Sequence, residues 1–311
     1  MKKEQFWKNF DLGTEVQLSG NFIYDGLHVF DQMEHFNHQD EIFEFLYFIS
    51  VGIERLLKVD VILIEHSEES NQFDFDESLK THSHTYLVNR INKKHKLNFG
   101  KVHSEFIQLL ANFYRSFRYD RFNLINYDKY DQEKQALVSF IEKHLDLKIS
   151  NEQLFVTQND KRFKKFIGKV IGKIVSQLYE LVVKEANRLN LYTYEIRTFS
   201  KAYKIFIEND YTFEKEQILQ KEILIYLIKN ELDSGFKDHI NKYLPALEFE
   251  NGSENDYSKC LFNLMNCRMV VDELDVLYED VEDKKLRLGA IDVIGSDCIF
   301  EKDFDEEFDD I

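Results

Sequence analysis

The chain has 311 residues, of which 43% are hydrophobic and 14% aromatic, so it has ample material for a folded core. Its 57 acidic and 40 basic side chains give a net charge of −17, which excludes a general DNA-coating protein with a uniformly basic surface. Proline occurs once, at Pro245, and there are 11 glycines. Because these two residue types punctuate turns and strand ends, their scarcity favours long helices joined by short polar loops. The fold class that we expect is therefore all-α.

The first elements form an N-terminal helical bundle over residues 1–148. The segment through Asn37 has a mixed character, and its glycines are expected to break it. A helix is expected from Gln39 or Asp40 to about His66, because apolar residues recur there every three to four positions and later occupy nearly all sides. That pattern is typical of a central, buried helix. Further helices are expected over residues 77–92, 102–118 and 132–147.

A second helical region is expected over residues 150–295. Its first helix, over residues 160–191, contains Gly168 and Gly172, whose spacing indicates the close approach of a neighbouring element. The later helices are expected over residues 194–207, 213–232, 237–243 and 257–278, and residues 291–300 show strand-like alternation. An acidic tail over residues 296–311 repeats phenylalanine every four positions. It is expected to be either a solubilising tail or a docking peptide for a protein partner.

Two features predict a cytoplasmic protein without a membrane span. The segment Met1–Phe10 lacks the apolar core of a secretory signal, and the most apolar window, Ile42–Ile64, carries five charges. Three cysteines form no disulfide framework. Cys260 and Cys267 lie seven positions apart on an expected helix and are interpreted as core residues.

Three helical blocks between residues 51 and 122 carry polar residues that a plain core helix does not need. These residues are Glu54 and Lys58, then His82 or His84 with Leu87, then Arg118, Tyr119 and Asp120. In this order they resemble the HEPN family of helical bundles, although the family's Arg-Tyr-Pro-Asp motif lacks its proline here. The resemblance covers roughly the first two fifths of the chain. It implies a nucleotide-associated bundle, often a homodimer, that serves in bacterial antiphage defence or stress response.

The same resemblance implies a candidate catalytic pair. HEPN ribonucleases carry an Arg followed four to six residues later by a His; the His moves a proton at the ribose 2′-hydroxyl and the Arg stabilises the phosphate charge, with no metal or cofactor. Arg90 and His95 have this spacing. The family's motif usually lies in a later helix, so a chance match stays open.

Phosphate or nucleic-acid contacts are expected from Lys58, Arg118, Tyr119 and Arg121. The alternative is architectural: Glu54 and Lys58 have the spacing of an ordinary helical ion pair, Arg118 could pair with Glu54, and Tyr119 could bury its ring. Basic runs over residues 93–103 and 161–165 could line an RNA groove or a solvated helix face. The histidines show no recognisable metal-ligand spacing with cysteine or carboxylate, so no metal is expected.

Two functions remain open at this level. The first is a metal-independent endoribonuclease that acts as a dimer through Arg90 and His95. The second is a non-catalytic helical scaffold that holds RNA or a protein partner.

Overall fold

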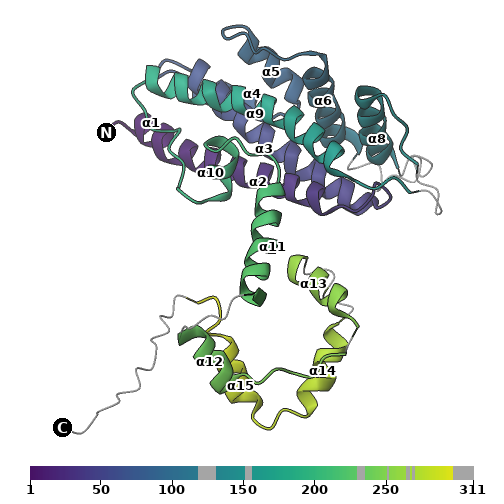
Figure 1. The fold of residues 1–311 in the computed structure, drawn as a ribbon. Coiled ribbons are helices and arrows are strands. Elements are labelled where there is room, and N and C mark those ends of the chain that lie inside the picture. The colour runs from purple at the N-terminus through teal and green to yellow at the C-terminus, as the bar shows by residue number, and fades with distance from the viewer. Residues whose placement is uncertain are drawn as a thin grey trace. The chain divides into compact units, whose positions relative to one another are not determined.

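The computed structural model describes residues 1–117, 131–150, 156–229, 235–250, 252–263, 267 and 270–296. Within these ranges the regular elements are helices, and the only β-type pairing is an isolated bridge between His35 and Gln158. The expectation of an all-α fold is confirmed. The chain divides into two compact units, Met1–Phe213 (unit 1) and Glu214–Ile311 (unit 2) (Figure 1).

The described helices of unit 1 are α1 (Lys3–Phe6), α2 (Leu12–Gln32), α3 (Gln39–Glu65), α4 (Gln72–Leu79), α5 (His84–Asn92), α6 (Lys101–Asn112), α8 (Gln132–Leu145), α9 (Lys161–Arg188) and α10 (Lys201–Phe206). Two π-helical turns join them, η1 (Trp7–Asp11) before α2 and η2 (Phe113–Phe117) after α6. Those of unit 2 are α11 (Glu214–Lys229), α12 (Gly235–Tyr243), α13 (Glu254–Phe262), α14 (Val271–Glu279) and α15 (Lys284–Ile291).

Helix α3 is the centre of unit 1, as its sequence pattern predicts. It contacts α2, α5, α6, α8 and α9, which surround it (Figure 1). From Ile49 to Ile64 nearly every side chain of the helix is buried, because apolar residues occupy all of its sides. The charged residues within this stretch, such as Glu54 and Asp60, are therefore placed close to the core, where an ionised group needs a partner.

The glycines before Asn37 do not break the chain, so that expectation is wrong. Helix α2 runs through Gly13, Gly20 and Gly26 without interruption. At Gly26 a Cβ atom would lie 2.7 Å from the Ile49 side chain on α3, so the bare backbone lets the two helices approach closely. The same role is played from the α3 side by Gly52, where a Cβ would lie 2.7 Å from Ile23 Cγ1.

The single helix expected over residues 77–92 is instead two helices. Helix α4 ends at Leu79 and α5 begins at His84. Ser83 is the reason, because its Oγ accepts a hydrogen bond from the Tyr86 N–H at 3.3 Å and caps a new helix. The break places His82 in an extended segment beside α3.

The boundary between the two units lies after Phe213, whereas the sequence suggested a division near residue 149. Helix α9 packs on α3 and α6, so it shares the core of unit 1.

The prediction for Gly168 and Gly172 is confirmed, because both face Tyr211. A Cβ at Gly168 would lie 2.8 Å from the Tyr211 carbonyl oxygen, and a Cβ at Gly172 would lie 2.5 Å from the Tyr211 ring.

Unit 2 differs from its expected helices in two places. Residues 257–278 are divided between α13 and α14, and α15 extends to Ile291, where the strand-like alternation begins; residues 297–300 lie outside the described part. Cys260 and Cys267 are only partly buried, do not share one helix and form a disulfide, so their interpretation as core residues of a single helix is wrong. Seven residues of continuous helix would separate them by about 10 Å. Because α13 ends at Phe262, the two Cα atoms come within 4.5 Å.

None of the described helices is both long and apolar enough to cross a membrane.

The α2–α3 approach gives a stability prediction. Gly52→Ala should lower the free energy of unfolding by about 1–3 kcal/mol, because the added Cβ meets Ile23 and lies 3.0 Å from the Ser19 carbonyl oxygen. Gly13→Ala is the matched control, since the nearest atom to its Cβ is 3.7 Å away. Gly13→Ala should raise the free energy of unfolding by up to about 1 kcal/mol, because alanine favours a helix more than glycine does. Urea unfolding followed by circular dichroism measures both, and equal effects would contradict the packing role.

Candidate functional site

Three polar side chains of the resemblance meet at one surface of unit 1. Glu54 and Lys58 lie one turn apart on α3, and Lys58 Nζ donates to Glu54 Oε1 at 2.7 Å. His82, in the segment before α5, lies beside the same carboxylate, with Nδ1 3.1 Å from Glu54 Oε2 and 3.3 Å from Oε1. We call Glu54, Lys58 and His82 the His82 cluster.

The cluster combines a buried carboxylate with an exposed imidazole. The Glu54 side chain is 9% exposed and that of His82 is 54% exposed. With Nδ1 directed at the carboxylate, the imidazole presents Nε2 on its opposite edge, the arrangement of histidines that transfer protons in enzymes. The Tyr114 ring, on the π-helical turn η2, lies 4.8 Å from the imidazole between ring centroids and supports its orientation.

Other histidines also lie beside carboxylates in the described part of the chain, but they are less accessible. The side chains of His66, His144 and His95 are 6%, 15% and 24% exposed, beside Glu4, Glu105 and Glu185. His82 therefore has the imidazole best placed to meet a substrate from solvent.

His84, the other histidine of the family pattern, has a structural position. It is fully buried, and its Nε2 lies 2.8 Å from the Ser50 carbonyl oxygen, which fits an N–H donor. Burial lowers the pKa of His84, so the ring is neutral and anchors α5 to α3.

Arg90 is held inside unit 1 by a carboxylate. Its Nη2 donates to Glu65 Oε2 at 2.6 Å and its Nε to Glu65 Oε1 at 3.2 Å, a bidentate pair. Its Nη1 donates to the Ser78 carbonyl oxygen and hydroxyl, and the residue is 7% exposed. The guanidinium also lies over the rings of Phe75 and Tyr86. It thereby connects α3, α4 and α5.

His95 lies at a different carboxylate from Arg90. Its Nε2 is 3.1 Å from Glu185 Oε1 on α9, close enough for an ion pair although not aligned for a hydrogen bond. Arg188 Nε donates to the other oxygen of Glu185 at 2.7 Å. The two residues of the expected catalytic pair thus each have a separate acidic partner.

Of the expected phosphate contacts, Lys58 belongs to the His82 cluster. Arg118, Tyr119 and Arg121 lie outside the described residues, as does Asp120. The sequence named Glu54, Lys58 and His82 as family markers but missed that they meet. Because 28 residues separate Glu54 from His82, no short motif signals this contact.

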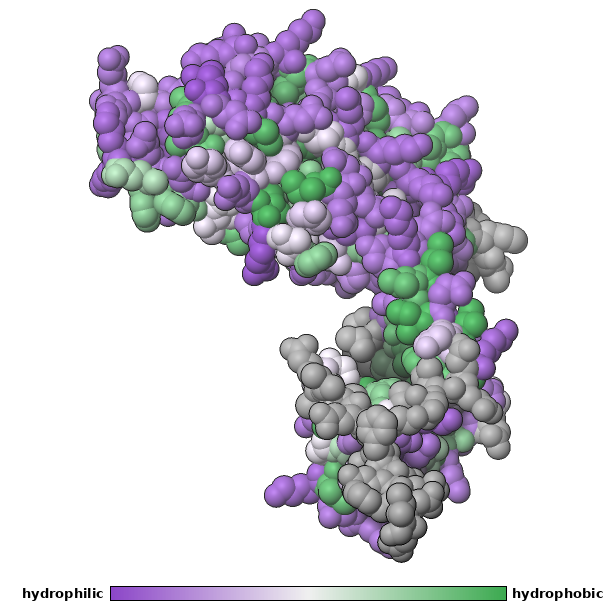
Figure 2. Space-filling model, turned by 60° about the vertical axis from the view of Figure 1, so that its left-hand side comes forward, coloured by the Kyte–Doolittle hydropathy of each residue, from purple (hydrophilic) through white to green (hydrophobic). Residues whose placement is uncertain are grey.

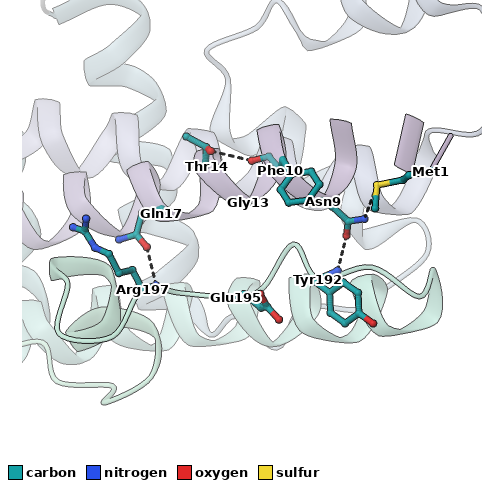
Figure 3. Close-up of a pocket in the computed structure, with 9 residues that line it drawn as sticks. All are labelled: Met1, Asn9, Phe10, Gly13, Thr14, Gln17, Tyr192, Glu195 and Arg197. Atoms are coloured by element: carbon teal, nitrogen blue, oxygen red, sulfur yellow. Dashed lines mark hydrogen bonds between the residues drawn. The ribbon is translucent and has the colours of Figure 1, made fainter. Parts of the chain in front are cut away.

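An open cavity of about 460 Å³ lies between η1 with α2 and residues 192–197 (Figure 3). Asn9 Oδ1 accepts from the Tyr192 N–H at 2.7 Å, and Gln17 Oε1 accepts from the Arg197 N–H at 3.2 Å. Both amides therefore hold residues 192–197, Asn9 against η1 and Gln17 against α2. With its side-chain amides already paired, the cavity is a weaker candidate than the His82 cluster.

The described residues contain no group of three or more His, Cys, Asp or Glu side chains that could hold a metal ion. Comparisons of the chain with protein-family models, with curated proteins and with solved structures find no match.

Asp60, on α3, is a second buried carboxylate and contrasts with Glu54. It is fully buried, and neither of its oxygens has a hydrogen-bond partner. Burial raises the pKa of Asp60 well above its ordinary value, and the charge of Glu185 adds to the effect. A protonated, neutral Asp60 is the form that this environment favours.

A pH-dependent stability is expected from Asp60. Because the folded state keeps a proton that the unfolded chain loses above its ordinary pKa of 3.8, this contribution to stability declines as pH rises from there towards the folded pKa. Asp60→Asn should remove the decline and raise the free energy of unfolding at pH 7 by about 1–3 kcal/mol. The measurement is urea unfolding at several pH values from about 4 to 7.

Asp40→Asn, an exposed carboxylate in the first turn of α3, is the control for this series. It should leave the pH dependence of wild type in place. If the free energies of unfolding of Asp60→Asn and of wild type changed in parallel with pH, Asp60 would be ionised in the folded protein.

Proposed function

We propose that unit 1 is a HEPN-like bundle that acts on RNA as a metal-independent endoribonuclease, with His82 as its proton-transfer group. The observation that supports this most strongly is the pairing of the exposed His82 imidazole with the buried Glu54 carboxylate. Both residues are among those that carry the family resemblance.

The chemistry that this pair can perform is general base catalysis. The Glu54 carboxylate orients the ring and stabilises the imidazolium that forms when Nε2 takes the proton of a ribose 2′-hydroxyl. The 2′-oxygen then attacks the adjacent phosphorus to form a 2′,3′-cyclic phosphate, the bond to the 5′-oxygen breaks, and the leaving 5′-oxygen takes up a proton from water. Lys58, one turn from Glu54, supplies a cation close to where phosphate charge increases.

Arg90 and His95 remain the alternative catalytic site within the same proposal. A second function is favoured by their geometry: both are engaged by carboxylates of the fold, as expected of structural residues in a non-catalytic scaffold that binds RNA or a protein partner. In either case Arg118, Tyr119 and Arg121 are proposed phosphate contacts. A cytoplasmic homodimer with a role in antiphage defence or stress response completes the proposal.

Cleavage of a mixed pool of structured and single-stranded RNA, in excess EDTA, tests the proposal. Wild type should cleave, and His82→Ala should reduce the rate by about 100-fold or more, the usual contribution of a general base. Glu54→Gln should also slow cleavage, because it keeps the shape of the side chain and removes its charge. His38→Ala is the matched control, an exposed histidine at the start of α3, and should cleave as wild type does.

The outcomes separate the alternatives. Loss of cleavage in His95→Ala and Arg90→Lys, with His82→Ala active, would move the site to the alternative pair. Equal cleavage by all variants would assign the activity to a contaminant. Absence of cleavage by wild type, together with RNA binding, would favour the scaffold.

A further inference from the structure

Unit 2 has little hydrophobic core of its own in the described part. The buried apolar cluster of the protein ends at Phe213, the last residue of unit 1. In unit 2 the buried apolar side chains that are described are Leu244 and Ala290. Large apolar side chains on α13, α14 and α15 are exposed, among them Leu261 at 66%, Val276 at 64% and Leu286 at 60%.

Helix α11 shows the strongest mismatch between composition and environment. It has no buried residue, although six consecutive apolar residues run from Ile223 to Ile228. The large exposed side chains of this helix are Ile218, Leu219, Ile223, Ile225, Tyr226, Leu227 and Ile228, at 45–74%. We call these seven residues the α11 apolar surface; Figure 2 shows hydrophobic side chains gathered on this helix.

A helical stretch that is apolar on all sides, as Ile223 to Ile228 is, is normally covered. Seven such side chains, each about half exposed, leave on the order of several hundred Å² of apolar surface, which in a soluble protein marks an interaction site. The composition of α11 therefore points to a partner.

Charge limits what that partner can be. Residues 214–311 carry 26 acidic and 11 basic side chains, a net charge of −15, whereas residues 1–213 carry 31 and 29, a net charge of −2. Almost all of the net negative charge of the protein is thus in unit 2. Nucleic acid, an anionic membrane and a second copy of unit 2 would each be repelled. A partner that offers both apolar and basic side chains is attracted.

We propose that unit 2 is a docking module for a basic amphipathic helix of another protein, with the α11 apolar surface as its contact. The apolar face of the partner helix covers Leu219, Ile223 and their neighbours. Its Lys and Arg side chains lie towards the acidic remainder of the unit. This interaction is independent of whether unit 1 cleaves RNA.

Fluorescence anisotropy of the full-length protein with a labelled amphipathic peptide of Leu and Lys, about 18 residues long to match α11, tests the proposal. The peptide should bind, and more weakly as salt is added. The matched peptide with Glu in place of Lys should not. The double variant Leu219→Gln, Ile223→Gln, which keeps every charge, should bind about tenfold more weakly or worse.

Phe73→Gln is the control for that variant, because Phe73 is a 72% exposed aromatic residue on α4 in unit 1. It should bind the peptide as wild type does. Equal affinity of wild type and the α11 double variant would show that the peptide binds by charge alone and would overturn the proposal. So would sedimentation showing a wild-type dimer that the double variant abolishes, since a second copy would then be the occupant.

Discussion

The burial of α3 on every side is the constraint on which the rest of unit 1 depends. A charged group on a buried helix needs a partner, and a neighbouring element must bring that partner to it. Glu54 meets His82 from the segment before α5, and Glu65 meets Arg90 from α5. Asp60 has no hydrogen-bond partner among the described residues, and its environment favours the neutral form. Two carboxylates of α3 thereby hold α5 and the segment before it, and one of these pairs reaches the surface as the His82 cluster.

The sequence predicted the elements whose signal is local and strong. The all-α class followed from the scarcity of proline and glycine, and α3 began within a residue of its expected start because the apolar periodicity is pronounced. The sequence did not predict the features of the helices that depend on tertiary contacts. The glycines of α2 looked like breaks because nothing local shows that α3 and α10 approach them. Ser83 divides α4 from α5 through a cap that a continuous apolar pattern conceals.

For the candidate site, too, the sequence predicted the local features and not the tertiary contacts. The sequence singled out Glu54, Lys58 and His82, but their meeting depends on how α3 packs against the segment before α5. Arg90 and His95 have the spacing of a catalytic pair, yet spacing does not show that Glu65 and Glu185 lie ready to engage them. The family pattern offers His82 or His84 and does not distinguish between them. The position of His82 emerges only because Ser83 ends the preceding extended segment and a buried carboxylate lies opposite.

Tyr211 packs directly against Gly168 and Gly172 of α9, close to the end of unit 1. This contact fixes the chain two residues before unit 1 ends, and the apolar cluster closes at Phe213. The described residues beyond Phe213 add nothing to that cluster. The described residues that form the core of unit 1 therefore all precede unit 2, and a gene could exchange residues 214–311 for another sequence without removing any of them.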